Sequence, residues 1–434
     1  MSTKKKDKRK NGKIVFRLRK VIGHFFPELF DKLREIKDYR KKSEYELAEL
    51  IMACVAMFMF KEGSRNAFNN DRLSDEFRDN YMNIFGLKLP HMDTVNVIMA
   101  HLAEEQLETL KVALVRELIK KKVFYDGRLL SRYYAVSIDG THTINVEEGH
   151  CNSCLHRTSK SGRVTYFHSV LEAKLVTSNG FSISLATEWI ENGEDEFAKQ
   201  DCELKAFVRL SEKLKRYYPY LPMCLLCDGL YANQTFFKIC MGYEWRWIVS
   251  FRDGNLPSVW EEVKGLQKIE TGNELNIRIG ECYQKYTWIN DIDYNGYLIN
   301  WLECVEEDKN EKHRFVHISD LKVNEKNVLT ITSHGRMRWK IENEGFNTQK
   351  NNGYGLNHKY SRTSMQALKN YYQCLQIAHM INQLFELGSL FKPLLQPKVT
   401  IKHIWKDMLG ELKGWLDMND LQIMLKHRIQ IRFG

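Results

Sequence analysis

The spacing of apolar residues changes partway along this chain of 434 residues, and the change limits the folds open to it. From Lys13 to about Lys122, apolar residues recur at the three- to four-residue interval of helices. Runs rich in β-branched and aromatic residues follow at 133–139, 166–177 and 181–187, separated by turn-forming residues. Strands therefore follow helices, and more than one layer of structure is expected.

After these three strands, strands and helices alternate. A helical stretch around 197–217 precedes the short apolar run 223–227, and a helix from Asn233 precedes a further strand at 245–251. Strands that come first together and then alternate with helices predict a mixed sheet covered by helices, which is an α/β fold. Between about Asn255 and Thr332, short alternating segments broken by Asn, Gly and Asp indicate a β-rich insertion.

These patterns divide the chain into six parts. The N-terminal tail is strongly basic, and it is either solvated or an arm that contacts phosphate. On its charge, the helical region behind the tail could bind DNA, but an all-helical segment more often serves only packing. The expected parts are a basic tail (1–12), a helical region (13–130), the first part of an α/β core (131–254), a β-rich insertion (255–332), the last core helix (333–360) and a helical C-terminal region (361–434).

Composition indicates what kind of partner the protein binds and in which cellular compartment it lies. The 65 Lys and Arg residues outnumber the 55 Asp and Glu residues, which gives a net charge of +10 and favours a polyanion such as nucleic acid. The ten Cys residues suggest reduced thiols. The longest nearly apolar stretch, 51–60, is half as long as a membrane span. We expect a cytoplasmic protein without a membrane partner, and the lack of a nucleotide-binding fingerprint implies no organic cofactor.

Two carboxylates stand where strands end. Asp139 closes the strand at 133–139, and Asp228 directly follows the run 223–227; each precedes a Gly. Open sheets bind ligands at this edge, although an Asp before Gly is also a common turn residue. Two carboxylates placed together repel each other unless a cation lies between them, and Mg²⁺ or Mn²⁺ prefers oxygen ligands. The pair therefore predicts a divalent metal site.

A third carboxylate comes from the helical stretch that follows the insertion. Glu342 and Glu344 compete for this place. At about 100° per residue, Arg338 lies on the face of Glu342, whereas Lys340 and Glu344 form an ordinary surface pair on the other side. We therefore take Glu342 as the third ligand and Glu188, which ends the strand at 181–187, as its substitute.

Three stretches together resemble the DDE transposases of bacterial insertion sequences. They are SIDGT at Asp139, LLCDGLYANQTFF at Asp228 and RWKIENEGFNTQKN at Glu342, with a β-rich insertion before the last. One branch of that family carries a Tyr, Arg, Glu, Lys signature, matched here by Arg338, Glu342 and, one residue late, Lys350. Gly335 stands where the family's Tyr is expected.

The resemblance implies a specific fold and chemistry. The fold is an RNase H-like mixed sheet flanked by helices, and the function is metal-dependent cleavage and strand transfer of DNA. Asp139, Asp228 and Glu342 would hold two Mg²⁺ ions. Arg338 and Lys350 would clamp phosphates, although both could also be solvated helix cations. The implied partners are double-stranded DNA, as element ends and as target, and a second copy of the chain in a homodimer.

Two aromatic residues of the insertion, Trp288 and Trp301, are candidates for stacking on a base displaced from the duplex, because relatives use this device in the same region. The alternative is that both lie in the core of a strand, where Trp is common.

A second cluster of metal-ligating residue types lies in GHCNSCLHR and just beyond it. Cys151 and Cys154 have the C-x₂-C spacing of zinc sites, with His156 and His168 close in sequence. The alternative is a pair of reduced loop thiols. Cys224 and Cys227 have the same spacing inside an apolar strand, so we expect core thiols there.

Three functions fit this sequence. A transposase accounts for the charge, the carboxylates and the insertion together. An RNase H-like nuclease would cut DNA without joining it. A domesticated DNA-binding protein would keep the fold without using the site.

Overall fold

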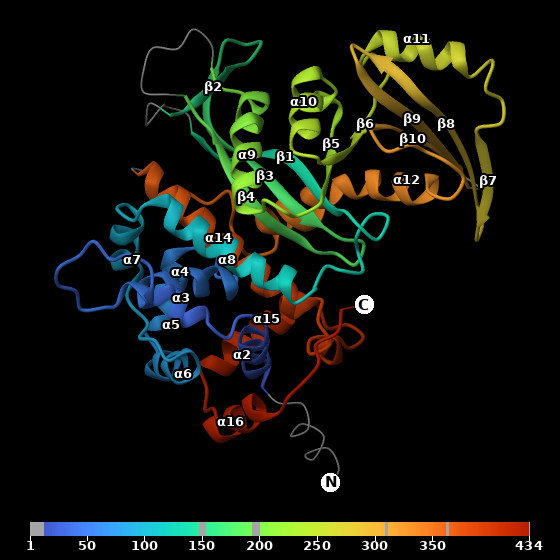
Figure 1. Ribbon diagram of the computed structural model, residues 1–434. Coiled ribbons are helices and arrows are strands. Elements are labelled where there is room, and N and C mark those ends of the chain that lie inside the picture. Colours follow the sequence, from blue (N-terminus) through green and yellow to red (C-terminus); the bar gives the residue numbers. More distant parts are fainter. Residues whose placement is uncertain (1–12, 147–152, 193–199, 309–310, 362–363, 434) are drawn as a thin grey trace.

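A computed structural model of the protein shows one mixed sheet with helices on several sides (Figure 1). The structure describes residues 13–146, 153–192, 200–308, 311–361 and 364–433. The strands are β1 (Tyr134–Val146), β2 (Leu155–Thr158), β3 (Val164–Val176), β4 (Ser182–Ile190), β5 (Met223–Cys227), β6 (Arg246–Ser250), β7 (Glu274–Ile279), β8 (Cys282–Tyr294), β9 (Tyr297–Glu307) and β10 (Lys312–Ser319).

Helices precede, interrupt and follow the strands. The helices before the sheet are α2 (Ile14–Phe25), α3 (Leu29–Arg34), α4 (Leu47–Met59), α5 (Arg65–Arg72), α6 (Asp75–Phe85), α7 (Met92–Met99) and α8 (Glu104–Lys120). Those among and after the strands are α9 (Glu203–Tyr217), η1 (Gly229–Tyr231), α10 (Gln234–Gly242), α11 (Pro257–Leu266), α12 (Val328–Arg336), η2 (Met337–Trp339), η3 (Ile341–Asn347), α13 (Thr348–Asn351), α14 (Met365–Glu386), η4 (Lys392–Leu394), α15 (Ile401–Leu412) and α16 (Met418–Lys426).

The order of the strands confirms the predicted fold class. Strand β1 pairs antiparallel with β3, which pairs antiparallel with β4, and on its other side β1 pairs parallel with β5, which pairs parallel with β6. Three antiparallel strands joined to two parallel ones, in the order β4–β3–β1–β5–β6, form an RNase H-like sheet. Helix α9 packs on β3 and β4, and α8 and α14 pack on β4.

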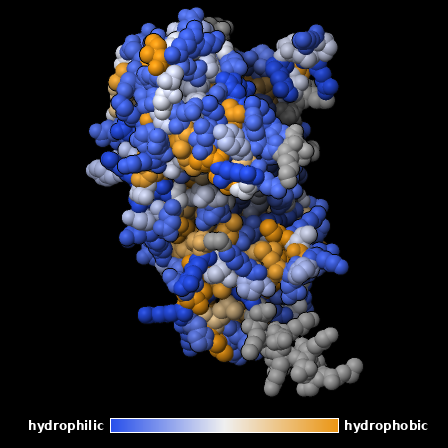
Figure 2. Space-filling model, turned by 90° about the vertical axis from the view of Figure 1, so that its right-hand side faces the viewer, coloured by the Kyte–Doolittle hydropathy of each residue, from blue (hydrophilic) through white to orange (hydrophobic). Residues whose placement is uncertain are grey.

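The insertion extends this sheet. Strand β10 pairs antiparallel with β6, and β9, β8 and β7 follow in order, so the ten strands form one sheet. The insertion also contains helix α11, which the alternating pattern did not predict; Pro257 at its first turn was the available signal. On the side of the molecule that carries the insertion, the surface is mainly hydrophilic with separate hydrophobic patches (Figure 2).

Helix α14 joins the two halves of the molecule. It packs on α4, α7 and α8 of the N-terminal helices and on β4 of the sheet, so segments far apart in sequence lie side by side (Figure 1). Every residue of α4 is buried, as expected for a helix that is apolar on all sides. Within the described ranges, no helix combines the length and the apolar character that a membrane span needs.

Buried amides fix the position of α14. Asn370 donates hydrogen bonds to the carbonyls of Met99 (2.8 Å) and Leu102 (2.7 Å) at the end of α7. Gln383 both donates to the Ser182 carbonyl (3.0 Å) and accepts from the Ser182 N–H (2.7 Å) in β4. A buried carbonyl without a partner costs free energy, so these side chains specify where the helix docks.

Replacing Asn370 by Leu should therefore destabilise the protein. The change removes the Asn370 donor from the Met99 carbonyl and from the Leu102 carbonyl, of which the second keeps a hydrogen bond from Gln366 (2.8 Å). We expect the free energy of unfolding to fall by about 1–3 kcal/mol. Urea unfolding followed by far-UV circular dichroism measures this. The exposed Gln234→Ala change on α10 is the control, and equal effects of the two changes would contradict the role given to Asn370.

Candidate active site

Parallel pairing of β1 with β5 brings two carboxylates to one edge of the sheet. The last paired residues of the two strands are Ser137 and Leu226, and Asp139 and Asp228 each follow their strand's pair by two residues. Each aspartate accepts a local hydrogen bond, from the Gly140 N–H to Asp139 (2.9 Å) and from the Leu230 N–H to Asp228 (2.9 Å). The predicted strand-end placement is confirmed for Asp228, which directly follows β5, but not for Asp139: β1 continues to Val146, and Asp139 pairs with Glu172 of β3. The two aspartates nevertheless share one edge of the β1–β5 pair, because the parallel pairing ends two residues before each.

Arg338 connects the third predicted carboxylate to the first. Its Nη1 lies 2.9 Å from Glu342 Oε1 and 3.5 Å from Asp139 Oδ2, and the Arg338 side chain is only 6% exposed. The predicted Lys340–Glu344 pair also forms, at 2.8 Å. Arg338 is therefore no solvated surface cation, because two carboxylates hold its guanidinium inside the site.

The helix that carries Glu342 differs from the regular α-helix assumed from the sequence. Residues Met337–Trp339 form a 3₁₀ turn, and Ile341–Asn347 form a π-helix. A π-turn holds one residue more than an α-turn and occurs often at functional sites. The extra residue turns Lys350 back toward the site, and its Nζ donates to Thr141 Oγ1 at 2.8 Å. Lys350 therefore lies beside the strand that carries Asp139.

A fourth carboxylate, which the sequence did not single out, belongs to Glu203. It is the first residue of α9, and its Oε1 accepts a hydrogen bond of 2.9 Å from the Tyr231 hydroxyl. A Cβ placed on Gly140 would lie 3.1 Å from Glu203 Oε2, so Glu203 reaches the backbone directly after Asp139. The signal was a carboxylate at a helix start in the run KQDCE, which is equally typical of a plain helix N-terminus.

Burial and mutual repulsion define the electrostatics of the site. Burial raises the pKa of Asp139, the Arg338 charge opposes that rise, and the charges of Glu342 and Glu203 add to it, so that the pKa is about 7. Burial also raises the pKa of Glu203, and the charge of Asp228 adds to that shift. The four carboxyl groups therefore lie close enough for each to oppose ionisation of a neighbour.

The chemistry of these donors suits a hard divalent cation, because all four are carboxylates whose repulsion a cation would relieve. In the part of the chain that the structure describes, no three His, Cys, Asp or Glu side chains already surround a common metal position. Arg338 instead supplies the positive charge between Asp139 and Glu342.

The substitute ligand Glu188 is a wrong prediction. Its carboxylate pairs with Arg209 (2.6 Å) and Lys213 (2.8 Å) on α9, and no contact connects it to the carboxylate edge within the described residues. A strand-end position alone did not reveal these ion pairs, because both partners come from a helix that follows the strand.

The predicted stacking residues are also corrected. Trp288 is 4% exposed and Trp301 is 1% exposed, because both pack inside the insertion's sheet, so neither can stack on a base as it lies. An exposed aromatic residue occurs elsewhere in the site. Trp339 is 51% exposed, and the Arg338 guanidinium lies 4.4 Å from the centre of its ring.

The candidate zinc ligands come together only in part. Cys151 lies outside the described residues. Cys154 Sγ lies 3.5 Å from His168 Nε2, whereas His156 is exposed on β2 with its ring 6.0 Å from that of Tyr166. Zinc binding stays a prediction. Cys224 and Cys227 are buried in β5, as expected for core thiols.

Packing explains the Gly at the position where the signature has Tyr. A Cβ on Gly335 would lie 2.6 Å from two ring atoms of the buried His317 and 3.1 Å from Ile248 Cγ2. The last turn of α12 therefore lies too close to the sheet for any side chain, and no aromatic residue can project from this point.

The comparisons with known proteins add little to this geometry. No family model matches the chain, and no curated protein matches it. Among solved structures, the chain is similar to a piggyBac transposase synaptic complex with hairpin DNA, with a TM-score of 0.40 and 10% identity over 95% of this chain and 82% of that chain. A likeness at this level does not establish a function, so the conclusions rest on the residues themselves.

The raised pKa of Asp139 predicts that the site lowers the free energy of unfolding by an amount that depends on pH. The pKa of this carboxyl is about 7 in the folded chain, against 3.8 for an unperturbed aspartate, so its protonated form stabilises the fold and that contribution is lost as pH rises through about 7. In metal-free buffer, Asp139→Asn should gain stability over the parent as pH rises from 5 to 8. Urea unfolding across this range measures the gain, which Glu344→Gln should not show. A difference independent of pH would contradict the account.

Close packing at Gly335 predicts that even a methyl group is harmful. Gly335→Ala should lower the free energy of unfolding by about 1–3 kcal/mol, because the Cβ overlaps the His317 ring. Gly410 within α15 is the matched control, since nothing lies within 4 Å of a Cβ there; Gly410→Ala should raise stability by about 0.5–1 kcal/mol. If both substitutions shifted stability in the same direction in thermal unfolding, the packing argument would be contradicted.

Proposed function

We propose that this protein is a metal-dependent DNA transposase that cuts DNA and joins the cut end to a target. The observation that carries the proposal is the gathering of Asp139, Glu342 and Glu203 around one guanidinium, with Asp228 at the same sheet edge. Carboxylates forced together in a basic protein suit the binding of divalent cations that neutralise a phosphodiester.

Asp139, Asp228 and Glu342 are the residues that would hold Mg²⁺ or Mn²⁺, and Glu203 joins them as a fourth oxygen donor. When bound, the ions activate an attacking oxygen and stabilise the leaving 3′ oxygen. Water would be the attacking group in cleavage, and the freed 3′-OH would attack target DNA in joining. One site serves both steps, because both replace one oxygen on phosphorus by another.

Two cations of the site would bind the phosphate. Arg338 presents a planar fork that can form two parallel hydrogen bonds to phosphate oxygens. It already interacts with Asp139 and Glu342, so ligation of a cation by these carboxylates would free the guanidinium for DNA. Lys350 supplies a point charge next to Thr141, two residues after Asp139. Burial lowers the pKa of Lys350, and the charge of Asp139 opposes that shift.

Trp339 would contact the DNA beside the cleaved bond. Its ring is half exposed and lies next to the guanidinium of Arg338, whereas Trp288 and Trp301 are enclosed in the insertion. A base stacked on an aromatic ring gains about 1–3 kcal/mol. Trp339 therefore replaces the two buried residues as the stacking candidate.

The proposed substrate is double-stranded DNA, as element ends and as target, bound by a homodimer. The net charge of +10 favours this polyanion, and salt should weaken its binding. A nuclease that cuts without joining is the second candidate, because the same carboxylates and cations suffice for hydrolysis.

Cleavage and joining by the purified chain test the proposal. Labelled DNA from the ends of the element that encodes the protein is incubated with Mg²⁺ or Mn²⁺, and cut and joined products are counted separately. Asp139→Asn, Asp228→Asn and Glu342→Gln should each slow cleavage by about a thousandfold or more, equivalent to about 4 kcal/mol in activation free energy. Glu203→Gln should slow it by about 10- to 100-fold.

Glu344→Gln is the matched control for these variants. Glu344 lies two residues from Glu342 and pairs with Lys340, so its loss should leave cleavage unchanged. Products that are cut but never joined would favour the nuclease. DNA binding without cleavage in either metal would contradict the catalytic proposal, and full activity of Glu342→Gln would remove that residue from the site.

A further inference from the structure

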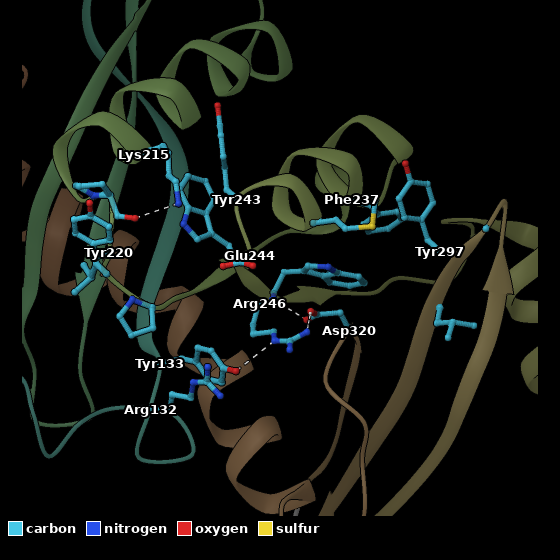
Figure 3. Close-up of a pocket in the computed structure, with 18 residues that line it drawn as sticks. Arg132, Tyr133, Lys215, Tyr220, Phe237, Tyr243, Glu244, Arg246, Tyr297 and Asp320 are labelled. Atoms are coloured by element: carbon cyan, nitrogen blue, oxygen red, sulfur yellow. Dashed lines mark hydrogen bonds and ion pairs between the residues drawn. The ribbon is translucent and has the colours of Figure 1, made fainter.

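A large hollow lies at the opposite end of the strands from the carboxylates. Its volume is about 940 Å³, and it is lined by the residues that open β6, the loop before β5 and the turn between β8 and β9 (Figure 3). Strand β5 has five residues, so the hollow lies about 17 Å from Asp228 along the strand. It is therefore separate from the proposed active site.

Aromatic rings dominate the walls of this hollow. Tyr220 is 95% exposed, and Tyr243 and Tyr297 are half-buried. Figure 3 shows Tyr220 and Tyr297 toward opposite ends of the hollow, with Arg246 between them. The floor is rigid, since Trp247 stacks on Phe237 with a centroid distance of 4.7 Å and an angle of 24° between the rings. Exposed rings above a packed floor form platforms that a flat ligand can stack on.

Two cations of the hollow are available to a ligand. Arg246 is already engaged, because it forms an ion pair with Asp320 (2.9 Å) and a hydrogen bond with the Tyr133 hydroxyl (3.4 Å). Arg132 and Lys215 form no ion pair with an acidic side chain of the described residues. Each lies over a ring instead, Arg132 at 5.2 Å from Tyr133 and Lys215 at 5.8 Å from Tyr243, and Lys215 also donates a hydrogen bond to the Pro219 carbonyl at 3.1 Å.

Basic side chains outnumber acidic ones in the lining of the hollow. The cations are Arg132, Lys215 and Arg246, and the acidic side chains are Glu244 and Asp320, of which Asp320 is held by Arg246. The balance of charge around the rings therefore favours a polyanion over an acidic or neutral protein surface.

We propose that this hollow binds single-stranded DNA, with unpaired bases stacked on Tyr220, Tyr243 and Tyr297 and phosphates bound by Arg132 and Lys215. Stacking platforms beside cations that have no acidic partner are the combination that binds single strands without sequence preference. A duplex keeps its bases stacked on each other, so it cannot use these rings. The proposal goes beyond the cleavage site and does not depend on the carboxylates.

Fluorescence anisotropy of a labelled twelve-nucleotide dT strand with the full chain tests this inference. Tyr220→Ala with Tyr243→Ala should weaken binding at least tenfold, because two stacked bases are lost. Arg132→Ala with Lys215→Ala should also weaken it and should reduce the slope of log affinity against log salt by about 1.4. Tyr283→Ala with Lys326→Ala, an exposed pair elsewhere, should change nothing.

Further measurements separate this inference from its alternatives. Asp139→Asn should bind the dT strand as the parent does, so loss of catalysis and loss of this site are distinguishable. Thermal unfolding of each variant shows whether the fold is intact. Unchanged dT affinity in both hollow variants would overturn the inference. The inference would also be overturned if the hollow variants lost self-association in sedimentation but kept dT binding. That result would assign the hollow to a second copy of the chain.

Discussion

Repulsion between carboxylates at one edge of the sheet is the constraint on which the site depends. Parallel pairing of β1 with β5 fixes Asp139 and Asp228 there, and the π-helix and α9 bring Glu342 and Glu203 against them. The fold tolerates this arrangement because Arg338 lies between two of the groups and because the pKa of Asp139 rises to about 7. The repulsion between the carboxylates lowers the stability of the fold at this edge, and a bound cation would restore it. Such a loss of stability is common at functional sites.

The remainder of the molecule holds that edge in place. Helix α14 passes between the N-terminal helices and β4, and its buried amides form hydrogen bonds to backbone on both sides. Asn370 donates to two carbonyls and Gln383 to one, so docking is specified by direction as well as by apolar contact. Lys174 on β3 joins the same layer through Gln376 of α14 at 3.0 Å, which ties the strand next to β1 to the central helix.

The sequence predicted the parts of the fold and the site that depend on local pattern. The ends of two apolar runs located Asp139 and Asp228, although β1 continues past Asp139 to Val146, and helical spacing chose Glu342 over Glu344. The sequence could not predict the π-helix that returns Lys350 to the site, because a π-turn depends on tertiary packing. Nor could it separate buried from exposed aromatic residues: Trp288, Trp301 and Trp339 look alike until the sheet of the insertion is assembled. Glu203 was missed because a helix N-terminus explains an acidic residue equally well.

Cleavage of the polypeptide by bound iron tests the central claim most directly. Fe²⁺ takes the place of Mg²⁺ in the protein, and ascorbate with peroxide then breaks the backbone close to the ion. The account predicts cuts near Asp139, Glu203, Asp228 and Glu342 together, all suppressed by excess Mg²⁺ and all lost in Asp139→Asn. Cuts at only one of these segments, or cuts confined to the region of Cys154 and His168, would contradict a shared site at the sheet edge.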